Sequence, residues 1–599
     1  MSPFTTRPVV MGRRGVVTSG HYLASAAGLR IMDQGGNAID AAAAMGFCLC
    51  LLEPQSNGLG GEVPTLIYSA NERQVYALSG MGWSPAAFTI EWCRANGIDL
   101  IPGDGYLPAC VPAMVGSWAL AVARFGHLSF SQILAPAIEL AEGGFAVYPG
   151  LHGALTGNER KFAERYPTSG AVYCPGGRAP EPGTVLRCPD WAATLKTLAR
   201  AEDAAKHKGR VAGIEAACDA FYRGPIAERI AAFIADHPVE DASGRAHAGL
   251  LTYADMAEWH AELDTPVTVN YRGLDVFKCP SWTQGPAFLQ QLTLLEGYDL
   301  AAMGHNSADY LHTLVECAKL AFADREAYYG DPLHDQVPMD VLLSKEYAAA
   351  RRALVGAVAS REMRPGDAGG GFPAYATLPV LEDTRRALAI LGGPVRDLGL
   401  GHAHMGDTTH LDAVDRLGNM VAATPSGGWL GTSPVIAGLG FPLGTRGQMF
   451  YLNAARPNAL AGHKRPRATL TPSLVLKDGQ PWMVFGTPGG DCQDQWTLQA
   501  FLNYVEFGMD LQESLDAPTL HSVHFPSSFY PREAYPGRIV AEGRMAKEVV
   551  AELERRGHEI QWTGDWANGK CMAIRYDGVR GVIHGAVAPK GSIGYALGW

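Results

Sequence analysis

Apolar residues recur at helical spacing near the start of the chain and in shorter, strand-like runs further on. The apolar stripe of residues 21–34 stops at Gly35-Gly36, and Asn37 can cap a second, alanine-rich helix that ends near Leu52. Short apolar runs predict a pair of strands at 65–69 and 74–78. Further apolar stripes at helical spacing predict four more helices, at 115–124, 131–142, 190–206 and 308–329.

The pattern changes in the last third of the chain. Residues 364–397 are rich in Gly, Pro and polar side chains, which predicts an exposed connector. Beyond it, short apolar runs flank hairpin-turn residues such as Asp415–Asn419 and Asp478-Gly479. The predicted elements are strands at 408–414, 420–423, 474–476 and 482–485 and a helix at 494–504. Strands backed by helices predict an α/β fold with a layered αββα arrangement.

Size and charge narrow the function classes. A chain of 599 residues can bury a large core, so one large domain or two closely packed domains are expected. The hydrophobic fraction of 47% and the charged fraction of 18% are typical of globular proteins. The net charge of -11, with no basic stripe along the chain, argues against a nucleic-acid partner.

The termini and the cysteines bear on the compartment. Residues 1–15 lack an apolar stretch of signal-peptide length, and the apolar run 41–52 is too short to span a bilayer. We therefore expect no membrane association and a cytoplasmic protein. The 11 cysteines are scattered and odd in number, which favours reduced thiols over a disulfide framework.

Common catalytic and metal motifs are absent. The chain has no HExxH, no paired CxxC, no Walker A loop and no GxGxxG after a strand, and the segment before Gly427 lacks the first glycine of a GxSxG elbow. His402, His404 and His410 are close in sequence, but no carboxylate pattern accompanies them, so we expect no metal site.

The informative block is Gly406-Asp407-Thr408-Thr409-His410, which enters a predicted strand. By composition alone it is an ordinary strand with threonines on it. Together with Val414-Asp415 and Gly418-Asn419, however, it resembles the start of the small subunit in the γ-glutamyltransferase family. Other segments resemble that family in the same order, namely 35–38, 40–42, 53–56, 58–61, 134–137, 141–145, 319–325, 464–466 and 486–490.

This resemblance implies the four-layer αββα fold of N-terminal-nucleophile hydrolases. It further implies a precursor that cuts itself between Asp407 and Thr408 into a large subunit, residues 1–407, and a small subunit, residues 408–599. The two would form one intertwined catalytic domain as a heterodimer. The substrate would be a small-molecule γ-glutamyl or related acyl amide, cleaved through an acyl-threonine intermediate. Water or an amine would be the acceptor, and no cofactor or metal would be needed.

The resemblance also implies roles for particular residues. Thr408 would be the nucleophile, with its freed α-amine as the base, because an α-amine titrates near pH 7.7–8.0 and is partly neutral at pH 7. The amide N–H groups of Gly489 and Gly490 would form the oxyanion hole. Ser426, which lies 426 − 408 = 18 positions after the nucleophile, would hydrogen-bond to it.

The expected glutamate pocket departs from the family pattern. Residues 80–85 contain no arginine for the substrate carboxylate, and Phe450 and Tyr451 follow Gln448-Met449 where an acidic residue would hold the amine. The carboxylate-binding serine pair is replaced by Ala468 and Thr469, and an asparagine by Gly428. Losing two charge-assisted bonds of about 1.5–3 kcal/mol each would weaken glutamyl binding by roughly a hundredfold.

Three alternatives stay open. Trp83, Phe450 and Tyr451 would give an apolar, aromatic wall that suits a non-glutamyl acyl group, as in the cephalosporin-acylase branch of the family. A glutathione hydrolase would need another cation, such as Arg446 or Arg467, to meet the carboxylate. An uncut, non-catalytic relative that only binds is the third possibility.

Overall fold

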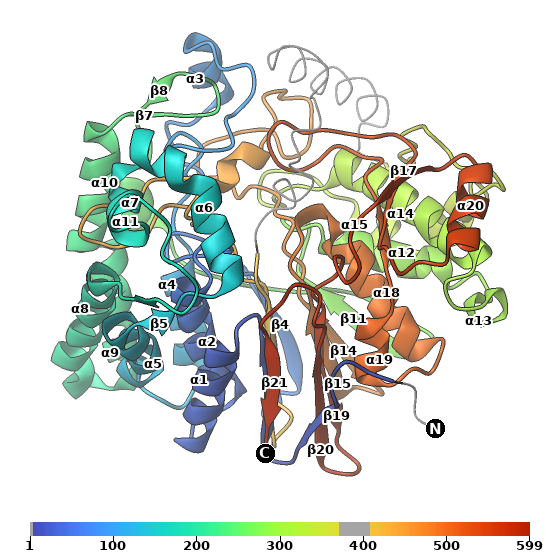
Figure 1. The fold of residues 1–599 in the computed structure, drawn as a ribbon, viewed down its shortest axis with the longest axis horizontal. Coiled ribbons are helices and arrows are strands. Elements are labelled where there is room, and N and C mark those ends of the chain that lie inside the picture. The colour runs from blue at the N-terminus through green and yellow to red at the C-terminus, as the bar shows by residue number, and fades with distance from the viewer. Residues whose placement is uncertain (1–3, 370–407) are drawn as a thin grey trace.

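Two seven-stranded sheets stand face to face in the centre of the molecule, with helices on both outer sides (Figure 1). The computed structural model describes residues 4–369 and 408–599. Within these residues the paired strands of the two large sheets run antiparallel. The predicted αββα arrangement is confirmed.

Sheet I has the strand order β21-β2-β12-β13-β3-β4-β9. Its strands are β21 (Tyr595–Gly598), β2 (Gly15–Ser19), β12 (Leu411–Asp415), β13 (Met420–Ala423), β3 (Thr65–Ser69), β4 (Gln74–Leu78) and β9 (Leu263–Asp264). Sheet II has the order β1-β20-β19-β15-β14-β11-β10. Its strands are β1 (Val10–Gly12), β20 (Val582–Val587), β19 (Met572–Asp577), β15 (Gln480–Gly486), β14 (Ser473–Lys477), β11 (Leu274–Lys278) and β10 (Val267–Tyr271).

Three apolar clusters hold the layers together, because each sheet has two faces to bury. The first lies between sheet I and the helices that cover its outer face. These helices include α1 (Tyr22–Asp33), α2 (Ala38–Leu52), α4 (Met114–Phe125), α5 (Phe130–Gly143), α8 (Pro189–Ala205) and α9 (Arg210–Tyr222). The second lies under the helices of sheet II, α12 (Gly285–Leu295), α14 (Ala308–Tyr328), α18 (Gln493–Val505) and α19 (Leu511–Asp516). The third fills the space between the sheets.

The remaining elements are shorter or peripheral. The small sheet β16-β17-β18 consists of Leu520–Ser522, Arg538–Ala541 and Glu559–Trp562, and two ribbons pair β5 (Phe145–Ala146) with β6 (Val185–Leu186) and β7 (Val239–Glu240) with β8 (Ala246–His247). The other helices are α3 (Ile90–Ala95), α6 (Pro149–Glu164), α7 (Pro167–Tyr173), α10 (Pro225–Asp236), α11 (Tyr253–Glu258), α13 (Leu300–Met303), α15 (Met339–Leu342), α16 (Lys345–Arg352) and α20 (Lys547–Arg555), with 3-10 turns at Lys206–Lys208, Arg446–Met449 and Gly490–Cys492.

Helix α2 shows why the sequence predicted its bounds well. The side chain of Asn37 accepts hydrogen bonds from the amides of Ile39 and Asp40, and the Asp40 carboxylate accepts one from the Asn37 amide. This capping box satisfies donors that a helix start leaves unpaired. All fifteen helical residues are buried, so the helix lies inside the molecule. The other six predicted helices and the strand pairs β3–β4 and β14–β15 are also present.

One strand differs from the sequence prediction in its starting residue, and its partners in the sheet were not predicted. The strand predicted to begin at residue 408 begins at Leu411, because Thr408 makes only an isolated bridge to Ser426. The neighbours of this strand in sheet I are β2 on one side and β13 on the other. Pairing with β2 joins segments about four hundred positions apart, which local patterns do not reveal. The predicted connector lies mostly outside the described residues.

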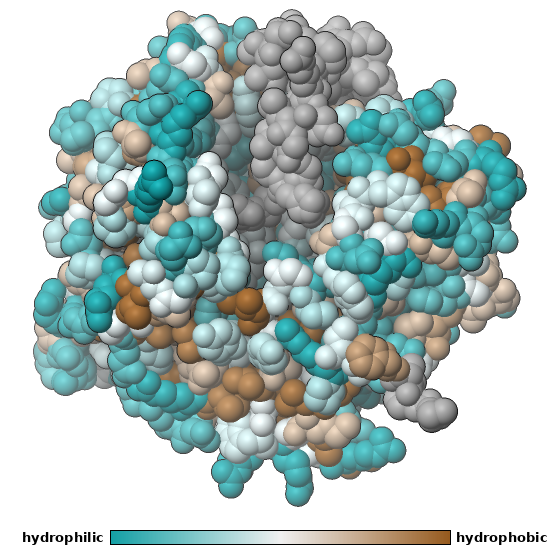
Figure 2. All heavy atoms as spheres, in the orientation of Figure 1, coloured by the Kyte–Doolittle hydropathy of each residue, from teal (hydrophilic) through white to brown (hydrophobic). Residues whose placement is uncertain are grey.

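The surface and the cysteines agree with the composition. Figure 2 shows hydrophilic residues over most of one face, with hydrophobic residues gathered in its lower middle part. All 11 cysteines are free thiols, and ten of them are buried. Among the described residues no helix combines the length and the apolar character needed to cross a membrane.

Candidate functional site

Thr408 lies just before the N-terminal end of β12, a central strand of sheet I, with its side chain inside the molecule. It is 5% exposed and forms an antiparallel bridge with Ser426, and the amide of Thr409 donates to the carbonyl of Pro425 at 3.0 Å. The Thr408 Oγ1 and Ser426 Oγ atoms are 3.0 Å apart, a hydrogen-bonding distance. The predicted pairing of these two hydroxyls is therefore present in the structure.

A buried ion pair lies behind the two hydroxyls. Arg446 donates from Nη2 to Ser426 Oγ at 2.8 Å and from Nε to Glu62 Oε1 at 2.7 Å. Glu62 is paired with Ser426 through two backbone hydrogen bonds of 2.9 Å. A cation therefore lies one hydroxyl away from Thr408.

The ring of His410, just before β12 of sheet I, lies against Gly486 at the end of β15 in sheet II. His410 is fully buried, and its ring nitrogens lie 2.9 Å from Thr424 Oγ1 and 2.9 Å from Asp412 Oδ1. A Cβ atom added to Gly486, at the end of β15, would come within 2.1 Å of the His410 ring. The ring therefore sets the spacing between the segment that carries Thr408 and the strand that leads to Gly489.

Gly489 and Gly490 follow β15 in conformations that favour glycine, with φ of 132° and 54°. Neither glycine donates its amide N–H to an acceptor among the described residues. A Cβ at Gly489 would come within 2.2 Å of the Trp496 ring. Trp496 in turn donates from Nε1 to His521 Nδ1 at 3.2 Å. This loop thus presents backbone donors and is held by an aromatic side chain beneath it.

A cluster of buried charges lies next to Tyr451, whose ring is covered by the guanidinium groups of Arg456 and Arg532 and whose hydroxyl donates to Glu326. Glu326 pairs with Arg325 at 2.9 Å and with Arg467 at 2.9 Å. Burial raises the pKa of the Glu326 carboxyl, but the charges of Arg467, Arg325 and Arg456 outweigh it and hold the pKa well below its usual range. Arg325 also pairs with Asp491, the residue after the glycine pair, which ties the cation cluster to that loop.

The family model described as gamma-glutamyltranspeptidase matches residues 24–597. The chain belongs to this family. It is 31% identical to the glutathione hydrolase-like YwrD proenzyme of Bacillus subtilis (strain 168) over 593 residues, 98% of this chain and 99% of that protein. The solved structure of LmbA2991T421A is 44% identical, covers both chains completely and superposes with a TM-score of 0.91. The cephalosporin acylase from Bacillus halodurans is 30% identical, with 100% and 98% coverage and a TM-score of 0.82.

Membership of the gamma-glutamyltranspeptidase family agrees with the N-terminal-nucleophile hydrolase fold expected from the sequence. Its members include proteins named glutathione hydrolase and acylase proenzymes, and the precursor state is part of those names. Asp407, the residue predicted before the cut, lies outside the described residues, as do His402 and His404. In the described parts of the chain no group of three or more His, Cys, Asp or Glu could hold a metal ion.

The structure places the predicted aromatic wall residues in different surroundings. Trp83 is half-buried and stacks on His463 with the ring centroids 4.5 Å apart. Phe450 is buried in a small apolar cluster with Phe88 and other residues. The hydroxyl of Tyr451 donates to Glu326. Their role as a wall of the substrate pocket stays a prediction.

The other predicted substrate residues lie near the candidate loops. Gly428 has a φ of 63°, and a Cβ there would lie 3.1 Å from the amide of Gly61. Ala468 exchanges backbone hydrogen bonds with Trp282 and Gln284, and Gln284 contacts the carbonyl of Gly490 at 3.4 Å. The Thr469 hydroxyl is buried without a partner in the described residues. A buried hydroxyl without a partner is costly, which favours a role for Thr469 in holding a ligand or water.

Glu62 is the site residue that sequence reasoning did not identify. It is 384 positions from its partner Arg446, so no local pattern links the two. The available signal was its place directly after the family segment 58–61.

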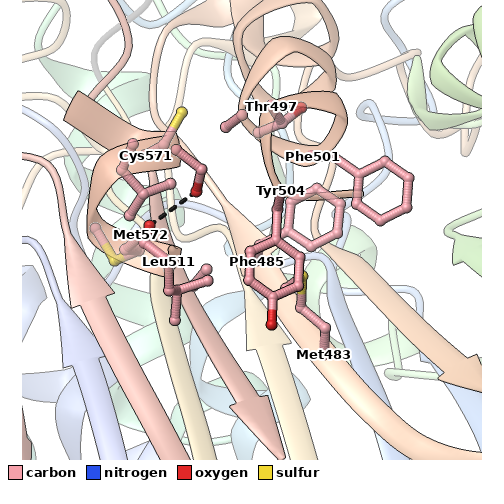
Figure 3. A pocket seen from close by; sticks show the side chains of 12 residues that line it. Met483, Phe485, Thr497, Phe501, Tyr504, Leu511, Cys571 and Met572 are labelled. Carbon is pink, nitrogen blue, oxygen red and sulfur yellow. Dashed lines mark hydrogen bonds between the residues drawn. The ribbon is translucent and has the colours of Figure 1, made fainter. Parts of the chain in front are cut away.

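An apolar void under sheet II can be excluded as the substrate site. Figure 3 shows it between α18, α19 and the ends of β15 and β19, with Met483, Phe485 and Phe501 in its lining. Its volume is about 10 Å³, room for one water-sized molecule at most. The lining is almost entirely apolar, so even a water would lack partners there.

Proposed function

We propose that the chain is cut between Asp407 and Thr408 and that Thr408 is then the nucleophile of an amide hydrolase or acyltransferase. The observation that carries this proposal is the 3.0 Å contact of Thr408 Oγ1 with Ser426 Oγ, which is backed by the Arg446 cation. A threonine hydroxyl needs activation to react. Residues 1–407 and 408–599 would then form the large and small subunits.

The reaction follows from these groups. The freed α-amine of Thr408 takes the hydroxyl proton as Oγ1 bonds to the acyl carbon. The amide N–H groups of Gly489 and Gly490 stabilise the oxyanion that forms. The proton passes to the departing amine nitrogen as the C–N bond breaks, which leaves an acyl-threonine. Water or an amine then attacks the ester, its proton goes to the α-amine, and Oγ1 recovers a proton as it leaves.

We further propose that the acyl donor is a small amide other than a standard γ-glutamyl compound. The absence of arginine in residues 80–85 supports this. The two alternative cations are already engaged: Arg446 contacts Glu62 and Ser426, and Arg467 pairs with Glu326. Meeting a substrate carboxylate would require one of them to leave a buried partner, which is costly. Cephalosporin acylase among the similar structures points the same way.

The proposal is tested first by the state of the purified chain. Cleavage before Thr408 predicts two fragments, and the smaller has 599 − 407 = 192 residues and begins with Thr-Thr-His. Denaturing electrophoresis with N-terminal sequencing identifies it, and a Thr408→Ala variant should remain uncut. A wild-type chain that stays intact and inert towards every amide would instead support the non-catalytic relative.

The donor class is tested on the cut protein. Steady-state rates on γ-glutamyl, glutaryl and simple acyl anilides are compared at equal concentrations of processed enzyme. The proposal expects higher kcat/KM on a non-glutamyl anilide. A clear preference for the γ-glutamyl compound would favour the glutathione hydrolase alternative.

A further inference from the structure

Arg446 and Glu62 form an ion pair that is almost wholly withdrawn from water. Arg446 is 1% exposed and Glu62 4%. The guanidinium carbon lies 4.8 Å from the centre of the Trp429 ring and 5.7 Å from that of Phe529. Taking two charges out of water costs free energy that their attraction often fails to recover. A buried pair directly behind the candidate nucleophile therefore points to a role beyond stability.

The chemistry of the guanidinium fixes the direction of its hydrogen bond to Ser426. Arginine has only donors, so Ser426 Oγ must accept the 2.8 Å bond from Arg446 Nη2. At 3.0 Å from Thr408 Oγ1, the Ser426 hydroxyl can in turn donate its hydrogen to that oxygen. A hydroxyl that accepts a bond from a cation is itself polarised into a stronger donor. With Ser426 as donor in this contact, the hydrogen bonds run from Arg446 through Ser426 to Thr408.

We propose that Arg446 is a positioning residue that stabilises negative charge on Thr408 Oγ1 through the Ser426 hydroxyl. This inference rests on the proposed function. The charge develops twice: as Oγ1 passes its proton to the α-amine and attacks, and as the C–Oγ1 bond breaks in deacylation. In both steps the hydrogen of Ser426 stays on Ser426. Its bond to Oγ1 strengthens as the charge grows, which lowers the barrier.

Glu62 holds the guanidinium in the orientation that this role needs. Its backbone is bridged to Ser426, and its carboxylate lies where a side chain of Gly427 would be, 2.3 Å from an added Cβ. The carboxylate therefore runs along the backbone that carries the Ser426 hydroxyl. Arg446 is fixed by this carboxylate at one edge and by aromatic rings at its faces, so its position does not depend on bound substrate.

The experiment compares a charged with a neutral replacement of similar length. Arg446→Lys keeps a cation near Ser426, whereas Arg446→Met removes it. Each variant is purified, its cut fraction is determined by intact mass, and kcat and KM are measured per processed enzyme with the best anilide. We expect Arg446→Met to lose about 10- to 100-fold in kcat with KM little changed, and Arg446→Lys to lose clearly less.

Matched controls separate this role from general destabilisation. Arg465 is also buried, lies over Trp282 at 5.5 Å and pairs with Asp331 at 2.7 Å, but it does not contact Thr408 or Ser426. Arg465→Lys and Arg465→Met should lower thermal stability as much as Arg446→Lys and Arg446→Met do. Unlike the Arg446 variants, they should leave kcat of the folded enzyme unchanged.

The outcomes are distinct. If the Met variant is not cut, the rate of self-cleavage gives the same comparison, because that reaction also uses Thr408 Oγ1. The inference is overturned if the wild-type enzyme is cut and active but Arg446→Lys and Arg446→Met have equal kcat or equal cleavage rates. A wild-type chain that is uncut and inert would overturn the proposed function instead.

Discussion

A methyl group added at Gly486 should push the segment that carries Thr408 away from the loop that carries the candidate oxyanion donors. The Cβ of a Gly486→Ala variant would lie 2.1 Å from Cε1 of His410 and 2.5 Å from each ring nitrogen. Gly486 is not among the residues with positive φ, so alanine suits its backbone and the effect is purely steric. Either the ring or the end of β15 must move.

The ring is the less movable of the two. His410 is fully buried and bonded to Thr424 and Asp412, so displacing it breaks two hydrogen bonds of about 1 kcal/mol each. Restoring an ordinary contact of 3.4 Å requires a shift of 3.4 − 2.1 = 1.3 Å. Misplacing catalytic groups by about 1 Å costs roughly a hundredfold in rate. Overpacking costs about 1–3 kcal/mol of stability besides.

The assay measures kcat per processed enzyme together with the free energy of unfolding. We expect Gly486→Ala to lower kcat by about a hundredfold, and Gly153→Ala, which adds a methyl group where nothing lies within 4 Å, to leave kcat unchanged. In a His410→Ala background the Gly486 substitution should cost much less, because its obstacle is gone. Wild-type kcat in Gly486→Ala, or equal costs in both backgrounds, would refute the reasoning.

Three further predictions concern neighbouring parts of the molecule. Ser426→Ala should lower kcat by about 10- to 100-fold, whereas Ser426→Thr, which keeps a hydroxyl, should lose less; steady-state kinetics on cut enzyme checks this. Burial lowers the pKa of His521 to about 3, so the unfolded chain binds the proton more tightly than the folded one. The free energy of unfolding should therefore fall as the pH drops below 6.5, by about 2 kcal/mol at pH 5. Urea unfolding at several pH values should show a smaller pH dependence in His521→Asn. Asn37→Ala should lower the free energy of unfolding by about 1–2 kcal/mol, because the helix loses its N-terminal cap, and should leave kcat unchanged.

The sequence predicted those parts of the fold whose contacts are local. The capped helix α2 and the hairpin β3–β4 were found because spacing, cap and turn residues lie within one short segment. Strand β2 and its partners β12 and β21 were not paired in advance, because their hydrogen bonds join segments hundreds of positions apart. Local periodicity carries no information on such partners.

The same division applies to the candidate site. The contact of Thr408 with Ser426 was predicted from the family, in which a hydroxyl residue eighteen positions after the nucleophile hydrogen-bonds to it. The Glu62–Arg446 pair behind it was not, and Arg446 was instead considered as a partner for a substrate carboxylate. Whether a buried cation meets a substrate or a protein carboxylate depends on side chains from distant segments, which only the folded structure brings together.

Both large sheets interleave strands from either side of residue 408. In sheet I, β2 lies between β21 and β12, and in sheet II, β1 and β11 flank the block formed by β20, β19, β15 and β14. The groups around Thr408 therefore meet only after the whole chain has found its partners. Under the proposed cleavage, only a chain that has folded would be cut, and the broken peptide bond would stay broken if the chain later unfolded. In any preparation, the fraction of cut chains would then equal the fraction of molecules that had folded correctly at least once.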